Sequence, residues 1–216
     1  MVHISNRRSI RRDARRVEIL RAAGRTFRDV GFAAAGMRDI AEAAALSPAN
    51  LYHYFRGKDE LLYFCQTRTL DRLLEALGRA RRRRAPLPDR LRELAVAHVL
   101  CLIDEVDGSA AHLEIDALPP RLRADVLARR DRYERGVRTL VGNAIKTRAF
   151  LGALNWTAYW YRPDGAEPAA VVAEQVAAFA VAGLALHDTH PRRPHRQRRA
   201  DRGRVRAVQN AARGAA

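Results

Sequence analysis

The side chains best suited to catalysis or metal binding are scattered along the chain. The seven histidines stand at positions 3, 53, 98, 112, 187, 190 and 195. His112 has two acidic neighbours, Glu114 and Asp116, but steps of two residues do not bring side chains to one face of a helix. Cys65 and Cys101 stand alone rather than in a CxxC pair, and no nucleophile elbow, phosphate-binding loop or HExxH motif is present. The sequence therefore predicts a protein that is not an enzyme, with no catalytic residue, no metal site and no cofactor.

A second group of residues is suited to different chemistry, and it is concentrated in the stretch NLYHYFRGKDELL, which begins at Asn50. Four aromatic rings follow one another in it, although Phe, Trp and Tyr make up only 6% of the chain. The hydroxyls of Tyr52 and Tyr54 and the imidazole of His53 can donate to phosphate oxygens or to base edges. Lys58 stands where the next helix begins, so its ammonium and the free N–H groups of the first turn are placed to hold a further phosphate. These residues indicate binding of nucleic acid.

The charge of the chain points to the same kind of partner. Lys and Arg number 40 against 24 Asp and Glu, which gives +16. Residues 1–16 hold six Arg and one Asp, or +5, and residues 187–216 hold nine Arg and two Asp, or +7. A polyanion such as DNA is the commonest partner of such basic arms, and the arm at 7–16 is placed to follow the minor groove. Solvated charge and an Arg-rich genomic composition are the alternatives.

Apolar periodicity predicts the helices that position these residues. A helix over 17–30 and a short one over 37–44 come first. Ser47 as N-cap and Pro48 as first helical residue open another short helix, which ends near Phe55. Two short helices joined by a tight link form a helix-turn-helix pattern, whose second helix lies in the major groove of DNA.

The inner face of this pattern is predicted to be apolar. Leu51 and Phe55 are four residues apart and share a face with Ile40 and Phe27, so these side chains are expected in the core. Gly31 is placed as the C-terminal cap of the first helix.

The rest of the chain also shows helical patterns. A long helix begins at Lys58, and others are predicted over 89–106, 121–147, 150–160 and 167–186, the last two separated by a turn at 162–165. No stretch shows sustained alternation, so the predicted fold class is all-α. Residues 187–216 are rich in Arg and poor in large apolar residues, which predicts a disordered tail. The absence of a signal peptide and of a membrane-spanning stretch predicts a cytoplasmic protein.

The segment from Arg15 to Leu62 resembles the tetracycline-repressor (TetR) family of bacterial transcription regulators. The resemblance rests on FRDVGFAAAGMRDIAEAAALSPANLYHYFRGKDELL, in which LYHYF-x-x-K-[DE]-x-L stands beside x-R-D-I-A. It implies an N-terminal three-helix bundle with the helix-turn-helix, followed by a larger helical ligand-binding and dimerisation domain, about nine helices in all. The expected divisions are a basic arm at 1–14, the DNA-binding domain at 15–62, the ligand-binding domain at 63–186 and the tail at 187–216.

The resemblance also implies roles for particular residues. The residues expected to face double-stranded DNA are Arg38, Ser47, Pro48, Ala49, Asn50, Tyr52, His53, Tyr54 and Lys58. Among them Tyr52, Tyr54 and Lys58 are the expected phosphate contacts, and Asn50 and His53 the expected base contacts. The family usually has Gly in the turn where this chain has Ala45-Leu46, and Thr or Ser at the position of Gly36.

A second resemblance concerns LGALNWTAYWYRPDGAEP at 151–168. It is similar to the penultimate helix of TetR-type regulators of lipid and steroid breakdown, some of which sense acyl-CoA thioesters. Asn155, Trp156, Tyr159 and Trp160 are therefore the predicted ligand-binding residues. The alternative is that these aromatic residues pack in a dimer interface, because in this family the last two helices usually form a four-helix bundle across a two-fold axis.

Two functional hypotheses follow. The first is a homodimeric repressor that binds a palindromic operator and is released by a small lipophilic ligand resembling an acyl-CoA. The second is an orphan DNA-binding protein of the same fold with a defective or absent pocket. Residues 146–150 favour the second, because the predicted helices leave no room there for the loop that relatives place between two ligand-domain helices.

Overall fold

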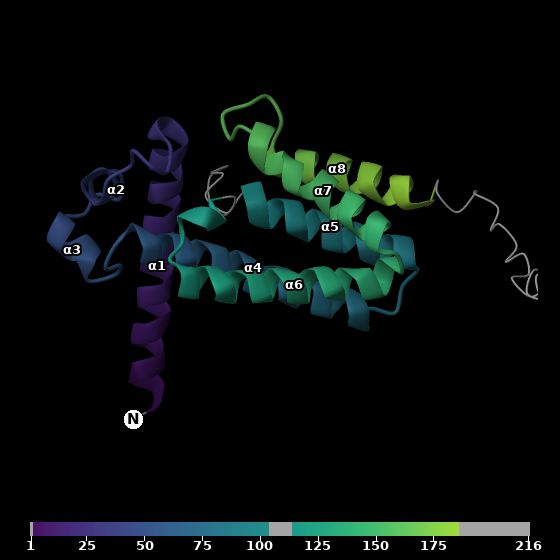
Figure 1. Ribbon diagram of the computed structural model, residues 1–216. Coiled ribbons are helices and arrows are strands. Elements are labelled where there is room, and N and C mark those ends of the chain that lie inside the picture. The colour runs from purple at the N-terminus through teal and green to yellow at the C-terminus, as the bar shows by residue number, and fades with distance from the viewer. Residues whose placement is uncertain (1, 104–113, 186–216) are drawn as a thin grey trace, which may run out of the picture. The chain divides into compact units, whose positions relative to one another are not determined.

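The computed structural model describes residues 2–103 and 114–185 of the 216-residue chain. In these ranges the chain forms eight α-helices and no strand, which confirms the predicted all-α class. The helices, with one short 3₁₀-helix called η2, are α1 (Val2–Val30), α2 (Met37–Ala43), α3 (Pro48–Tyr52), α4 (Lys58–Arg82), α5 (Leu87–Ile103), η2 (Ile115–Ala117), α6 (Pro120–Val141), α7 (Ala144–Trp160) and α8 (Ala169–Ala185) (Figure 1). None of the helices in the described ranges is long and apolar enough to cross a membrane.

Helices α1, α2 and α3 form the predicted three-helix unit. Their inner faces meet in a common core, in which Phe27, Ile40, Leu51 and Phe55 are all buried, as predicted. Helix α1 ends where expected, because Gly31 takes a φ of +80°, which a residue without a Cβ adopts without strain.

The basic N-terminal arm differs from the prediction. Helix α1 begins at Val2 rather than near residue 17, so the arm at 1–14 and the first DNA-binding helix are one continuous element from Val2 on. An α-helix is about 10–12 Å wide with its side chains, whereas the minor groove of B-DNA is only about 6 Å wide. The expectation that this arm follows the minor groove is therefore not supported by its helical form.

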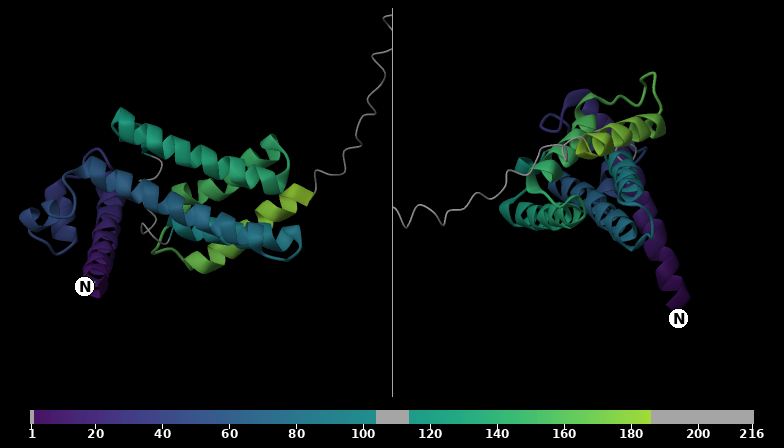
Figure 2. Two further views of the ribbon diagram at one scale, coloured as in Figure 1. Left: turned by 90° about the horizontal axis from the view of Figure 1, so that it is seen from below. Right: turned by 90° about the vertical axis from the view of Figure 1, so that its right-hand side faces the viewer.

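Helices α4 to α8 form the second part of the molecule. Helix α4 packs against α5 and α6, α5 packs against α7 and α8, and α7 also contacts α6 and α8 (Figure 2). Helix α4 approaches α6 closely at Gly136, where an added Cβ would lie 2.3 Å from a methyl carbon of Leu77. Because α4 begins at Lys58 and runs to Arg82, the predicted boundary at 62/63 lies inside one helix that is common to both parts.

The largest error of the sequence prediction concerns α6 and α7. The apolar pattern predicts a helix that runs to Thr147 and another that starts at Phe150, but the break lies at Gly142 and Asn143. Gly142 has a φ of +80° and ends α6, and the Asn143 side chain accepts the N–H groups of Ile145 and Lys146 at 2.8 and 3.0 Å. Residues 146–150 lie inside α7, so the short connection that was predicted there is instead the two-residue turn Gly142-Asn143.

The other helix ends differ less. Helix α3 stops at Tyr52 instead of Phe55, and α4, for which the sequence predicts only the start, ends at Arg82. The predicted turn before the last helix is confirmed by the Gly165 N–H, which donates to the Arg162 carbonyl at 3.0 Å. The predicted end of α5 at residue 106 and the predicted disordered tail at 187–216 lie outside the described residues.

Candidate DNA-binding surface and ligand cavity

The turn between α2 and α3 is built from local hydrogen bonds. The Oγ atom of Ser47 accepts the N–H of Asn50 at 3.2 Å, and Pro48 occupies the first helical position, so the predicted cap is confirmed. Ala45 has a φ of +52°, the left-handed conformation that glycine adopts more readily than any other residue. The chain thus keeps the turn that the family resemblance implies, at some cost in backbone strain.

Seven of the nine predicted DNA-facing residues are exposed, on α2 or in and beside α3. The exposed ones are Arg38, Ser47, Pro48, Ala49, Asn50, Tyr52 and His53. Tyr54 is half-buried and packs against the core, whereas Tyr52 is 51% exposed. The surface is therefore accessible to DNA, and the individual contacts stay predictions.

The side chain of Lys58 makes hydrogen bonds within the protein that the sequence did not indicate. Its Nζ atom donates to the carbonyl oxygens of Phe32, Ala33 and Ala35 at 2.6, 3.0 and 3.0 Å, and it lies 4.7 Å from the centre of the Phe32 ring. An ammonium has three protons, so these bonds use all of them. Lys58 thus has a structural role, in which it fixes the loop after α1 to the start of α4, and its phosphate contact stays a prediction.

Arg16 joins α1 to the base of α4. Its guanidinium lies over the rings of Phe55 and Phe64, at 4.6 and 4.2 Å from their centres, and is 3.7 Å from a carboxylate oxygen of Glu60. Burial lowers the pKa of Arg16 from its ordinary value. The sequence placed Arg16 in a basic arm, since a run of arginines does not show which one is turned inward.

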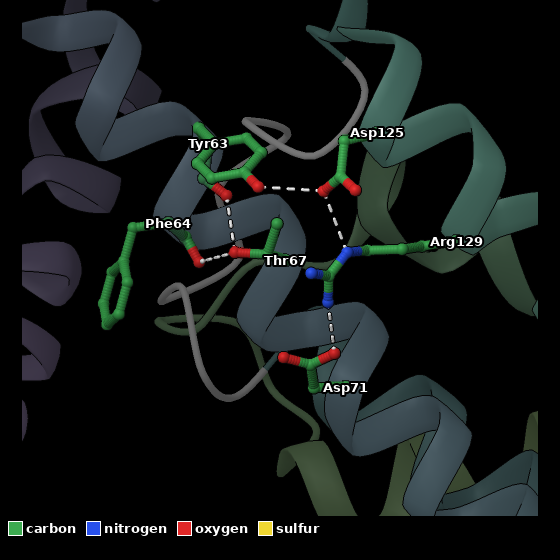
Figure 3. Close-up of polar contacts among 6 residues, drawn as sticks. All are labelled: Tyr63, Phe64, Thr67, Asp71, Asp125 and Arg129. Carbon is green, nitrogen blue, oxygen red and sulfur yellow. Dashed lines mark hydrogen bonds and ion pairs between the residues drawn. The ribbon is translucent and has the colours of Figure 1, made fainter. Parts of the chain in front are cut away.

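A polar network joins α4 to α6 (Figure 3). The Tyr63 hydroxyl donates to Asp125 at 2.8 Å, and Arg129 donates to Asp125 at 2.9 Å and to Asp71 at 2.6 Å. The hydrogen bond from Tyr63 holds the pKa of Asp125 below its ordinary value. Because Phe64 beside Tyr63 packs against Phe55 of the helix-turn-helix unit, this network begins next to the DNA-binding part.

A cavity of about 390 Å³ lies among α4, α5, α6 and α7. Its walls are partly apolar and partly polar, and they are formed by Gln66, Thr69, Leu70, Leu73, His98, Leu102, Arg130, Tyr133, Glu134, Leu151, Asn155 and Tyr159. Four of these residues come from α4, so the helix that begins in the DNA-binding part also forms a wall of the cavity.

A buried histidine is the centre of the polar wall. Nδ1 of His98 lies 3.0 Å from the Tyr133 hydroxyl, and Nε2 lies 3.0 Å from Oδ1 of Asn155. Burial lowers the pKa of His98 to about 4. Sequence reasoning missed His98 and Tyr133, because neither stands in a motif and their 35-residue separation is bridged only by the fold.

The structure divides the four predicted ligand-binding residues into two pairs. Asn155 and Tyr159 line the cavity, whereas Trp156 and Trp160 are 60% and 46% exposed and are not part of its wall. The reason is helical geometry: Leu151, Asn155 and Tyr159 follow one another at steps of four and share a face, and the tryptophans are turned by one residue from it. The assignment of Trp156 and Trp160 to the pocket is therefore wrong.

The tryptophans belong instead to an exposed apolar surface on the last two helices. The large apolar side chains exposed on α7 and α8 are Ile145, Trp156, Tyr159, Trp160, Val171 and Phe179. The rings of Trp156 and Tyr159 lie 4.8 Å apart. We refer to these six residues as the α7/α8 apolar surface, and its position agrees with the alternative prediction of a dimer interface.

An accessible helix-turn-helix and a helical domain with an internal cavity define a class of proteins, the one-component DNA-binding regulators. Two family descriptions match the chain: "Bacterial regulatory proteins, tetR family" over residues 19–63, and "Tetracyclin repressor-like, C-terminal domain" over residues 84–184. The chain belongs to the TetR family of transcriptional regulators. The prediction from the helix-turn-helix sequence is confirmed, as is the prediction that the protein is not an enzyme.

Solved structures of TetR-family regulators share the fold. PfmR from Thermus thermophilus is 30% identical, with 76% of this chain and 97% of that chain covered and a TM-score of 0.66. AibR, solved in complex with isovaleryl coenzyme A and operator DNA, is 26% identical, with coverages of 78% and 97% and a TM-score of 0.60.

Two curated relatives from Mycolicibacterium smegmatis are matched over shorter segments. The transcriptional activator FasR is 40% identical over 89 residues, which span 40% of this chain and 41% of FasR. The transcriptional repressor KstR2 is 39% identical over 49 residues, which span 23% of this chain and 24% of KstR2. Both matches thus span less than half of the relative's length.

Proposed function

We propose that the protein is a homodimeric repressor that binds a palindromic operator through α3 and is released when a short acyl-CoA occupies the cavity. The observation that carries this proposal is the course of α4. One end of this helix is fixed to the DNA-binding part by Lys58, and its middle forms a wall of the cavity. A ligand that changes the position of α4 would therefore change the position of α3.

The exposed surface of α3 supports DNA binding. In helix-turn-helix dimers the second helix of each protomer enters the major groove, and the two half-sites lie about 34–36 Å apart along the DNA. Asn50 and His53 are exposed at this surface and are suited to contact base edges, and Tyr52 to contact phosphate.

The walls of the cavity support an acyl ligand. Leu70, Leu73, Leu102 and Leu151 supply an apolar lining for a hydrocarbon chain, and the polar wall is suited to a thioester. Its volume of about 390 Å³ is at the lower end of the range of about 300–1,000 Å³ that is usual for ligand pockets. A short acyl group with its thioester is therefore the favoured occupant, and AibR, which is similar to this chain, has been solved in complex with isovaleryl coenzyme A.

The α4–α6 network supplies a route from the cavity to the DNA-binding part. Arg130 and Tyr133 of α6 line the cavity, and Asp125 and Arg129 of the same helix are bonded to α4. A ligand that binds better to one arrangement of α4 and α6 shifts the population toward it, and operator affinity changes by the same coupling free energy.

The α7/α8 apolar surface supports dimerisation. Its six large apolar side chains are exposed on α7 and α8, which pack against each other, and exposed apolar surface of this kind marks protein–protein contact sites in soluble proteins. A second copy related by a two-fold axis would cover the same patch on both protomers.

Release of DNA tests the proposal. An operator sequence would be recovered by repeated selection from random duplex DNA, and its binding to the full chain followed by fluorescence anisotropy with increasing isovaleryl-CoA. We expect the apparent Kd for DNA to rise at least about fivefold, the lower end of typical allosteric coupling. Binding of DNA that isovaleryl-CoA leaves unchanged, together with no calorimetric signal for the ligand, would instead support the orphan DNA-binding protein.

The observation that favoured the orphan alternative, a short connection between two ligand-domain helices, changes its position. Residues 146–150 are the interior of α7, and the connection between α6 and α7 is the Gly142-Asn143 turn, which is two residues long and is closed by hydrogen bonds to the Asn143 side chain. The two curated relatives act in opposite directions, FasR as an activator and KstR2 as a repressor. Repression by this chain is therefore a proposal. A reporter gene under the selected operator would distinguish repression from activation by its expression without ligand.

A further inference from the structure

The hydrogen bonds in the polar wall of the cavity have a direction that follows from the chemistry of their members. Oδ1 of Asn155 can only accept, so Nε2 of His98 must carry a proton and donate it. The buried ring is neutral near pH 7, because its pKa is lowered to about 4, and a neutral imidazole has one N–H group. Nδ1 is therefore an acceptor, and the Tyr133 hydroxyl donates to it.

This direction decides which part of Asn155 remains for a ligand. The amide oxygen is directed at His98, so the amide nitrogen, with its two protons, is the part of the same planar group that is left for a ligand. Asn155 is exposed and lines the cavity, while His98 and Tyr133 are 2% and 4% exposed. The amide is thus held from its buried side and offers donors on its open side.

We propose that Asn155 recognises the carbonyl oxygen of an acyl thioester, and that Tyr133 and His98 are positioning residues that keep its amide nitrogen turned to the ligand. This inference rests on the proposed acyl-CoA function and specifies how the cavity selects that ligand class. Leu151 lies one helical turn before Asn155 on the same face of α7 and would contact the start of the acyl chain.

A matched pair of ligands isolates the carbonyl oxygen. Isovaleryl-CoA and its thioether analogue isopentyl-CoA differ by the replacement of C=O with CH₂, and both would be titrated into the full chain by calorimetry. We expect the protein to prefer the thioester by about tenfold or more, because a site built to donate a hydrogen bond leaves its donors unpaired with the thioether. Asn155→Asp places an acceptor where the donor was and should abolish this preference.

Two further variants provide the controls. Gln175→Glu makes the same amide-to-acid change at an exposed position of α8, outside the cavity wall, and should keep the preference. Tyr133→Phe removes the donor to Nδ1 of His98, so the ring and the Asn155 amide lose their fixed direction and the preference should fall. A role of Tyr133 in packing alone would change the melting temperature and leave the preference for the thioester intact.

The tautomer of His98 gives a readout that needs no ligand. In ¹⁵N NMR spectra near pH 7 the inference requires His98 to be protonated at Nε2, and an Nδ1–H signal would overturn it. Equal binding of the thioester and the thioether would overturn the inference and leave the ligand cavity in place. Failure of the unmodified protein to bind either compound would overturn the proposed ligand class as well.

Discussion

Lys58→Ala separates the two roles that the sequence and the structure give to this residue. In the structure Nζ donates three hydrogen bonds to the carbonyl oxygens that follow α1, and the side chain is half-buried. Hydrogen bonds from charged groups contribute about 1.5–3 kcal/mol each, but water can replace the lost donor at the exposed side of this loop. We therefore expect a total loss of about 2 kcal/mol in the free energy of unfolding.

The measurement has two parts, made on the same preparation. Thermal unfolding should shift downward by about 4–8 °C, since 1 kcal/mol corresponds to about 2–4 °C in a chain of this size. The dependence of operator affinity on salt concentration should keep its slope, because an ammonium that is bonded to three carbonyl groups releases no counterion from DNA.

Arg38→Ala is the matched control, because Arg38 is exposed on α2 at the predicted DNA-facing surface. It should leave the melting temperature nearly unchanged and reduce the salt slope by about one. An unchanged melting temperature for Lys58→Ala together with a slope smaller by about one would refute the structural role and restore the phosphate contact.

Three other perturbations test the turn, the apolar surface and the buried histidine. Ala45→Gly should stabilise the protein by up to about 1 kcal/mol, because relief of about 1–2 kcal/mol of left-handed strain exceeds the cost of the extra entropy of the unfolded chain. Ala43→Gly at the end of α2 should instead destabilise it by about 0.5–1 kcal/mol. Denaturant titration that gives both changes the same sign would contradict this. Trp160→Ala should raise the dissociation constant of the dimer, measured by analytical ultracentrifugation, by about 30-fold or more, as for an interface hot spot. Leu87→Ala, which removes an exposed apolar side chain on α5, should leave it unchanged. An unchanged dissociation constant for Trp160→Ala would exclude this residue from the interface. Burial lowers the pKa of His98 in the folded state to about 4, so the unfolded state binds a proton first as the pH falls. The free energy of unfolding should therefore decrease by about 3 kcal/mol between about pH 6.5 and about pH 4. His98→Gln should flatten this part of a urea-unfolding pH profile, and an equal slope in both proteins would contradict the assignment.

The DNA-binding part could be predicted from the sequence because its signals are local. Ser47 and Pro48 cap α3 through atoms only a few residues away, and the spacing of Leu51 and Phe55 already determines which side is buried. Each feature depends on neighbours within one or two turns, and such features are read directly from a linear pattern.

The break between α6 and α7 was missed although its signals are also local. Gly142 followed by Asn143 is a C-terminal cap followed by an N-cap, but apolar residues continue on both sides of it, from Leu140 and Val141 to Ile145. The periodic pattern thus concealed a change of direction. A cap pair of this kind should interrupt a helix prediction even where the apolar spacing is unbroken.

The cavity wall could not have been found by the same means. His98, Tyr133 and Asn155 come from three helices, and what joins them is the packing of α5 between its neighbours. Asn155 and Trp156 show what a motif cannot predict, since they are adjacent in one motif but only Asn155 lines the cavity. A motif match alone does not state which face of a helix is turned inward.

The large positive charge of the chain supports DNA binding less strongly than its size suggests. Arg90 donates to the carbonyl of Ala80 at 2.6 Å and so completes the last turn of α4, and Arg81 donates to the carbonyl of Gly136 at 3.0 Å across the α4–α6 contact. Arg15 donates to the carbonyl of Ala44 at 3.3 Å. Such arginines stabilise helix ends and helix contacts, and their charge is not directed at a partner. What supports DNA binding is therefore the exposed α3 with its caps and its packed inner face. A salt slope well below the formal charge of +16 is the expected consequence, because only the cations that reach phosphate release counterions.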